Sequence, residues 1–303
     1  MSRHFEWTAD DLRAIVVRFG ADFYEKLRRH LDMCAEQWSL TSLRLIPSFS
    51  ANVVFRCASP KYGPAVLKFG RPADIAAEFH TLRQYNGKRF CSVYEADLEN
   101  GILLEEAVKP GTPLRNEPSL DNRLAVFCSL FEGLHIEADE AERFPTYTGW
   151  VDRIAEYMGR RRDCAELARH MQKAKDICLS LSAVYSRRML LHGDFHHDNM
   201  LLAENGTYKI IDPKGVVGDP VFDVPRFVLN EFDEEITEET RRKINKILRV
   251  LGQKLRIPET VLKRCLYVET AMGACWSVED GASPGEYPKL IKTVAFAEAI
   301  MNA

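Results

Sequence analysis

Several common features are missing from this sequence, and each absence excludes a class of protein. No apolar run approaches the ~20 residues that a transmembrane helix needs. Residues 1–20 carry charges throughout, unlike a secretory signal peptide. Neither sign of charge dominates, because 41 basic residues face 44 acidic ones, so no bulk field would attract nucleic acid or an anionic membrane. We therefore expect a cytoplasmic protein that binds small molecules, with no nucleic-acid or membrane partner. The sequence leaves its oligomeric state open.

The eight cysteines are scattered, and no two of them form a C-x-x-C pair. The sequence therefore offers no zinc or dithiol redox motif of that kind. Most of the cysteines fall in apolar surroundings, which favours reduced and buried thiols.

A length of 303 residues is enough for two lobes, since single cores tend to stop growing near ~250–300 residues. Apolar residues recur at helical spacing over 8–40. The period then changes to two, which predicts a small antiparallel sheet that starts with strands at 43–46, 53–57 and 65–69. Further elements are predicted as a helix at 72–82, strands at 90–98 and 101–106, and helices at 120–135 and within 150–188. A boundary near 107 would separate an N-terminal lobe, 1–107, from a mainly helical lobe, 108–303.

The most informative stretch is LLHGDFHHDNMLLAENGTYKIIDPKG, residues 190–215. A polar loop carries Asp194 and Asn199, a hairpin turns at Asn205-Gly206, and its second strand leads to Asp212. Two carboxylates and an amide at one strand mouth can hold a hard divalent ion, while one carboxylate accepts a proton from a hydroxyl. This combination indicates phosphoryl transfer.

The spacing H-x-D-x-x-x-x-N, followed by a strand and an Asp, is the catalytic-loop arrangement of kinases. His-Gly-Asp and Asp-Pro-Lys-Gly in place of His-Arg-Asp and Asp-Phe-Gly resemble the aminoglycoside phosphotransferases. The likeness is greatest to the streptomycin 6-phosphotransferase and hydroxyurea-kinase branch, which shares HGDxHHDN and IDPKGxxGDPxxD. This resemblance implies a two-lobe, protein-kinase-like α+β fold that uses ATP and Mg²⁺. Asp194 would be the catalytic base, and Asn199 and Asp212 would hold the metal.

The same resemblance assigns nucleotide-binding roles in the N-terminal lobe. Lys68, in the V-L-K that ends the third strand, would neutralise the α- and β-phosphates, and Glu78 on the next helix could pair with it. The turn over the phosphates lacks glycine, so Ser50 and Asn52 would have to donate groups there. Glu105 lies in the L-L-E-x-x-x-x-P-G segment that would form the hinge against adenine.

Other residues are expected to support the loop or to bind the acceptor. Asp223 would accept hydrogen bonds from the backbone of the catalytic loop, and the remaining candidates are His192, His196, Asp219, Trp276, Glu279 and Asp280. The acidic stretch 230–242 is either a solvated turn with a helix start or a rim that attracts a cationic acceptor.

The acceptor implied first is an aminoglycoside such as streptomycin, with hydroxyurea or another small hydroxylated metabolite as the alternative. A nucleotide-binding regulator without activity would normally lack Lys68, Asp194 or Asp212, and all three are present. A protein kinase would need an activation segment, and the gap at 215–223 is too short for one.

Overall fold

The computed structural model describes residues 4–47 and 51–303, which form two compact units. The first unit comprises Met1–Thr112 and Leu201–Ile211, and the second comprises Pro113–Met200 and Asp212–Ala303. The predicted boundary near residue 107 does not account for residues 201–211, which belong to the first unit. The two units are described separately below.

Two helices open the first unit, where the sequence predicts one over 8–40. α1 (Ala9–Phe19) begins with a capping box, in which Thr8 Oγ1 accepts from the Asp11 backbone N–H at 3.1 Å and Asp11 Oδ2 accepts from the Thr8 N–H at 3.0 Å. α2 (Ala21–Gln37) follows at once. Gly20 separates them with a φ of +91°, a conformation that favours glycine.

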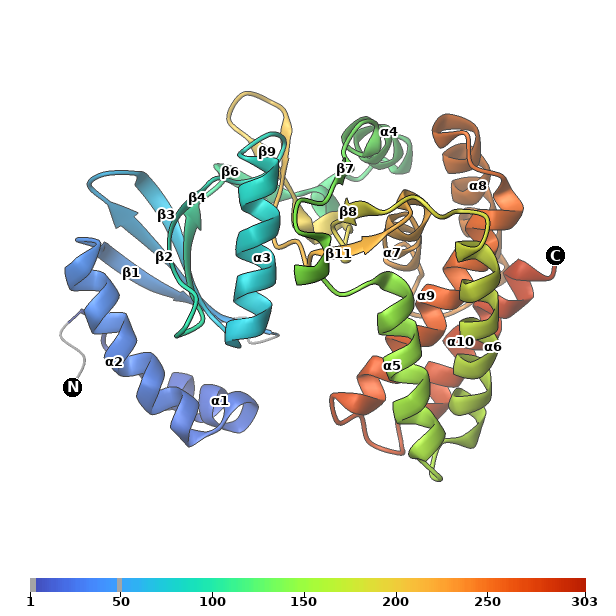
Figure 1. Ribbon diagram of the computed structural model, residues 1–303, viewed down its shortest axis with the longest axis horizontal. Helices are drawn as coiled ribbons and strands as arrows, with labels where there is room; N and C mark the ends of the chain where they lie inside the picture. The colour runs from blue at the N-terminus through green and yellow to red at the C-terminus, as the bar shows by residue number, and fades with distance from the viewer. Residues whose placement is uncertain (1–3, 48–50) are drawn as a thin grey trace. The chain divides into compact units, whose positions relative to one another are not determined.

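The sheet of the first unit is antiparallel, with the strand order β1-β2-β3-β5-β4. Its strands are β1 (Thr41–Ile46), β2 (Val53–Ser59), β3 (Gly63–Phe69), β4 (Val93–Asp97) and β5 (Ile102–Glu106). One face carries Phe55 and Leu67, which pack with Leu27 and Leu31 of α2. On the other side of the sheet lies α3 (Pro72–Tyr85) (Figure 1). The strands predicted from the alternating pattern are confirmed.

A hairpin from later in the sequence completes the first unit. β9 (Met200–Ala203) and β10 (Tyr208–Ile210) form a small sheet with β6 (Pro110–Pro113), in the order β10-β9-β6. The turn between β9 and β10 contains Gly206 at a φ of +78°. The backbone N–H of Cys91 donates to the Ile210 carbonyl at 2.9 Å, which ties the hairpin to the rest of this unit.

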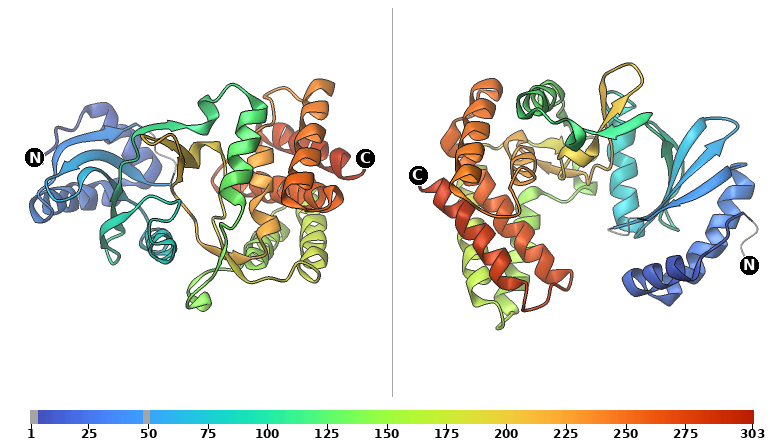
Figure 2. Two further views of the ribbon diagram at one scale, coloured as in Figure 1. Left: turned by 90° about the horizontal axis from the view of Figure 1, so that it is seen from above. Right: turned by 180° about the vertical axis from the view of Figure 1, so that it is seen from behind.

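The second unit is mainly helical, and four of its helices, α5, α6, α9 and α10, pack together (Figures 1 and 2). Its helices are α4 (Leu120–Phe131), α5 (Tyr147–Arg160), α6 (Ala165–Ser182), α7 (Pro225–Leu229), α8 (Glu238–Leu255), α9 (Glu259–Glu279) and α10 (Tyr287–Met301). A small sheet has the order β11-β8-β7, with β7 (Ile136–Glu137), β8 (Met189–Leu191) and β11 (Val216–Gly218). Within 4–47 and 51–303 no helix is both long and apolar enough to span a bilayer.

Candidate active site

In the first unit, Lys68 lies between two glutamates. Its Nζ atom is 2.5 Å from Glu78 Oε1 and 2.9 Å from Glu105 Oε1. All three side chains are at most 6% exposed. The pairing of Lys68 with Glu78 matches the sequence-based expectation, whereas the contact with Glu105 was missed, since Glu105 was placed only in the hinge. The result is one ammonium shared by two buried carboxylates.

Of the two residues proposed for the phosphate-covering turn, only Asn52 lies in the described part of the chain. Ser50 lies outside the described residues. Asn52 Oδ1 is buried and has no hydrogen-bond partner in the described part of the chain. A Cβ on Gly70 would lie only 2.1 Å from this oxygen. The side chain of Asn52 therefore packs directly on that glycine.

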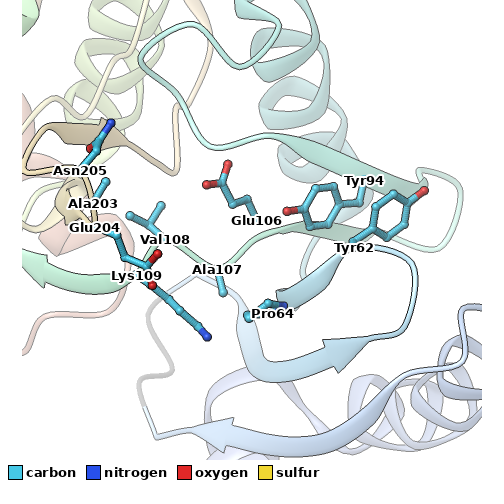
Figure 3. Close-up of a pocket in the computed structure, with 10 residues that line it drawn as sticks. All are labelled: Tyr62, Pro64, Tyr94, Glu106, Ala107, Val108, Lys109, Ala203, Glu204 and Asn205. Carbon is cyan, nitrogen blue, oxygen red and sulfur yellow. The ribbon is translucent and has the colours of Figure 1, made fainter.

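A pocket of about 430 Å³ lies beside the predicted hinge (Figure 3). Residues 106–109 line one part of it and the hairpin turn at 203–205 lines another. Tyr62 and Tyr94 stack at 4.4 Å between ring centroids along its edge. Glu106 is fixed by Lys209 Nζ, which lies 2.5 and 2.7 Å from its two carboxylate oxygens. The hinge segment is therefore anchored to the hairpin of its own unit.

In the second unit, the predicted catalytic loop follows β8 and is held by Asp223. The backbone N–H groups of His192 and Gly193 donate to the Asp223 carboxylate at 2.7 and 2.8 Å, and His135 Nε2 lies 2.9 Å from it. Burial raises the pKa of Asp223, but the hydrogen bond and charge of His135 outweigh that effect and lower it. Asp223 thus remains a carboxylate that fixes the start of the loop.

Gly193 explains the His-Gly-Asp variant of the kinase motif. Its φ is +79°, and a Cβ at this position would lie 2.9 Å from the Trp150 ring and 3.0 Å from Val216. A side chain here would be strained in backbone conformation and would also clash. The loop can therefore pass closely under Trp150 only with glycine at 193.

Asp194 presents its carboxylate next to two basic groups. Oδ1 is 3.1 Å from Arg226 Nε and 3.5 Å from His196 Nε2, and the side chain is 23% exposed. Burial would raise the pKa of Asp194, but the hydrogen bond from His196 and the charge of Arg226 lower it well below its usual range. The group is therefore ionised at neutral pH.

Asn199 and Asp212 provide oxygen donors suited to Mg²⁺. Asn199 Nδ2 donates a hydrogen bond to the Asp194 carbonyl at 2.9 Å. This bond fixes the orientation of the Asn199 amide through its nitrogen. Asp212 has a φ of +57°, and its Oδ2 lies 2.8 Å from Lys214 Nζ. No cluster of three His, Cys, Asp or Glu residues that could hold a metal is found in the described residues. The Asp212 carboxylate and the Asn199 amide oxygen are the kind of donor that Mg²⁺ takes together with substrate phosphates.

The remaining predicted support residues make specific contacts. His192 Nδ1 accepts from the Asp194 N–H at 3.1 Å, and Asp219 binds Arg187 Nε at 3.1 Å. The Trp276 ring lies 5.8 Å from the Arg226 guanidinium. Glu279 receives two hydrogen bonds from Arg153, at 2.6 and 2.9 Å. Asp280 is exposed at the end of α9.

The acidic stretch 230–242 does not form a uniform rim. Glu231 is buried, and its oxygens lie 2.7 and 2.9 Å from Arg123 and 2.8 Å from His197 Nε2. Burial raises its pKa, but these hydrogen bonds and charges lower it to about 2. Asp233 is neutralised by Lys243 Nζ at 2.5 Å. The cation-binding interpretation is therefore wrong for Glu231 and is weakened for Asp233.

Two residues beside Asp194 were missed by the sequence reasoning. Arg226 Nη2 lies 3.1 Å from Oε1 of Glu269, a buried side chain of α9. Tyr147 donates a hydrogen bond to Glu269 Oε2 at 2.7 Å. A glutamate within the buried stretch 265–272 of α9 needs a partner, and that was the available signal. The sequence alone did not reveal which residue the partner is.

The fold defined by these elements is that of the protein-kinase-like small-molecule kinases. The choline kinase LicA from Streptococcus pneumoniae aligns with a TM-score of 0.60 at 15% identity, covering 90% of this chain and 99% of that one. The aminoglycoside phosphotransferase APH(4)-Ia, in a ternary complex with ADP and hygromycin B, aligns at 0.58 and 14% identity, covering 89% and 97%. The predicted fold class is confirmed.

The sequence narrows this class to one family. Residues 37–281 match the model of the aminoglycoside/hydroxyurea antibiotic resistance kinases, and the chain belongs to that family. Streptomycin 6-kinase of Streptomyces griseus is 22% identical over 276 residues, 82% of either protein. Hydroxyurea phosphotransferase of Kitasatospora aureofaciens is 26% identical over 292 residues, 93% of this chain and 81% of that protein.

Proposed function

We propose that this protein transfers the γ-phosphoryl group of ATP to a hydroxyl of a small molecule. The observation that carries the proposal is the state of Asp194: an ionised carboxylate, partly exposed, on a loop whose backbone is fixed by Asp223. Such a carboxylate can orient an acceptor hydroxyl and take its proton. Membership of an antibiotic-resistance kinase family supports the same reaction.

The other residues have roles in positioning and charge neutralisation. Lys68 binds the α- and β-phosphates, and Asn199 and Asp212 hold Mg²⁺. Bound Mg²⁺ would neutralise charge on the phosphate oxygens. Asp194 aligns the acceptor oxygen with the phosphorus and accepts the hydroxyl proton as the new P–O bond forms and the bond to ADP breaks. Because the transition state of phosphoryl transfer is loose, positioning and charge account for most of the rate.

The first acceptor class is an aminoglycoside such as streptomycin, on which two relatives act by name. A second candidate is hydroxyurea or a similar uncharged acceptor. It is favoured by the pairing of Glu231, Asp233 and Glu279 with basic side chains, which leaves less negative charge for a polycation.

The test is an acceptor panel with Mg-ATP, containing streptomycin, other aminoglycosides and hydroxyurea. ADP release is measured with and without each acceptor, and the phosphorylated product is identified by mass spectrometry. We expect acceptor-dependent ADP release with one class and a product heavier by one phosphoryl group. ADP release that no acceptor increases would overturn the proposal.

A further inference from the structure

The guanidinium of Arg226 packs against one face of α9, which we call the guanidinium site. Glu269, Gly273 and Trp276 follow each other at helical spacing, so they share one face of that helix. Arg226 Nη2 lies 3.1 Å from Glu269 Oε1, and its guanidinium lies 5.8 Å from the Trp276 ring. A Cβ on residue 273 would be 3.8 Å from Arg226 Nη1, an ordinary van der Waals distance, so the guanidinium packs close to α9 at this position. A carboxylate, the helix surface and an aromatic face thus contact one side chain.

From the guanidinium site, Arg226 also contacts Asp194, the proposed catalytic base. Arg226 Nε is 3.1 Å from Asp194 Oδ1, while Nη2 of the same guanidinium is 3.1 Å from Glu269 Oε1. One cation is therefore shared by two carboxylates, of which Glu269 is sealed and Asp194 is accessible. Neither Arg226 Nε nor Glu269 Oε1 makes an aligned hydrogen bond in the described chain. Charge and shape, rather than hydrogen-bond geometry, hold the guanidinium in place.

We propose that Arg226 is a positioning residue for phosphoryl transfer, held by Glu269, Gly273 and Trp276 so that its contact with Oδ1 of Asp194 leaves Oδ2 to face the acceptor hydroxyl. This rests on the proposed function of Asp194. Glu269 has a defined part in the arrangement, because it draws the guanidinium back from Asp194. Without that carboxylate, Arg226 can form a two-pronged pair with Asp194 and cover both of its oxygens.

The principal test uses Arg226→Ala, Arg226→Lys and Glu269→Gln, with Arg161→Gln as a matched control. Arg161 is a partly buried arginine of the same unit, paired with Asp163 and away from the catalytic loop. With the acceptor found in the panel, we expect Arg226→Ala to lower kcat by ~10²-fold, the usual effect of a misplaced reacting group, while the KM for ATP changes only a few-fold. Arg226→Lys should retain more activity than Arg226→Ala. Glu269→Gln should also lower kcat, although Glu269 is buried away from substrate.

Chemical rescue separates positioning from a general loss of structure. Guanidinium at tens of millimolar should raise the kcat of Arg226→Ala at least tenfold, because it can bind at the guanidinium site on α9. It should not help Arg161→Gln or Asp194→Ala. An Arg226→Ala enzyme with wild-type kcat would overturn the proposal, and so would a loss of kcat that guanidinium leaves unchanged.

A measurement without turnover keeps this proposal distinct from the proposed function. A double-mutant cycle of Asp194→Asn and Arg226→Met, followed by urea unfolding, measures whether the two side chains are coupled. We expect non-additive shifts of the unfolding midpoint. Additive shifts would refute the positioning role whatever the enzyme phosphorylates. Coupling in a protein that phosphorylates no acceptor would instead reject the proposed function and leave the Asp194–Arg226 contact standing.

Discussion

Each unit contains a cation shared by two carboxylates, and the two arrangements differ in how they meet solvent. Lys68 lies between Glu78 and Glu105, and all three are almost completely buried. Arg226 lies between Asp194 and Glu269, but Asp194 is 23% exposed and Arg226 is 20% exposed. A sealed triad holds its lysine in one position, from which it would contact the phosphates. A triad with one accessible carboxylate also presents a base to a ligand.

This difference predicts that changing Asp194 affects rate far more than stability. Asp194→Ala should lower kcat by ~10²–10⁴-fold, the range for a positioned base, while ATP affinity stays within a few-fold. The loss of stability should be smaller than for a fully buried pair, because Arg226 keeps its pairing with Glu269. Steady-state kinetics, nucleotide titration and urea unfolding of the same variant measure all three quantities. Retained turnover would remove Asp194 from the role of base.

Changing the sealed triad should cause a large loss of stability in addition to its effect on ATP binding. Lys68→Met would leave two uncompensated carboxylates in a buried position, and breaking a buried pair in this way destabilises proteins by about 3–5 kcal/mol. Urea unfolding should show that loss, and Lys68→Met/Glu105→Gln should recover part of it. Arg71→Gln, which removes an exposed arginine paired with Asp74, serves as the control and should change stability little. An unchanged midpoint for Lys68→Met would show that solvent reaches the triad.

The sequence predicted the sealed triad better than the open one, for a physical reason. Lys68 lies near the end of a strand and Glu78 lies on the buried side of the next helix, so local periodicity brings them together. Glu105 joins them because β5 pairs with β3, which places Leu103 opposite Lys68 and Glu105 opposite Val66. Arg226 and Glu269 belong to helices whose packing no local pattern specifies, and Glu231 looked like surface because its stretch is acidic.

The stability contributed by Glu231, a third charged group, should depend on pH. The pKa of Glu231 is about 2, below its ordinary value of 4.5, so its carboxylate stabilises the fold above pH ~4.5 and loses that effect as pH falls towards 2. The difference corresponds to about 3 kcal/mol at neutral pH. Glu231→Gln should therefore be less stable than wild type at pH 7, with a gap that narrows on acidification.

Urea unfolding from pH 7 to pH 3 measures that gap. Asp121→Asn is the control, because Asp121 is 74% exposed and is paired with Lys246 on the surface of the second unit. Its difference from wild type should be small throughout. If the Glu231→Gln gap stayed constant over this range, the stabilisation would come from packing rather than from the ionised carboxylate.

The smallest expected effect concerns exposed charge outside both triads, and it decides between the two acceptor classes. Glu234, Glu235 and Asp280 are exposed, and Glu279 is paired with Arg153. Opposite charges at ~4–8 Å in water contribute only fractions of a kcal/mol each, although several together can focus the field. Replacing these four acids by Gln or Asn should raise the KM for a cationic aminoglycoside about two- to threefold and leave kcat unchanged. The rise should shrink with added salt, because ions screen exposed charges. Arg153→Gln removes the cation beside Glu279 and should shift KM the other way, whereas neither change should affect hydroxyurea. A KM for streptomycin that is insensitive to both charge and salt would refute the cationic rim and favour an uncharged acceptor.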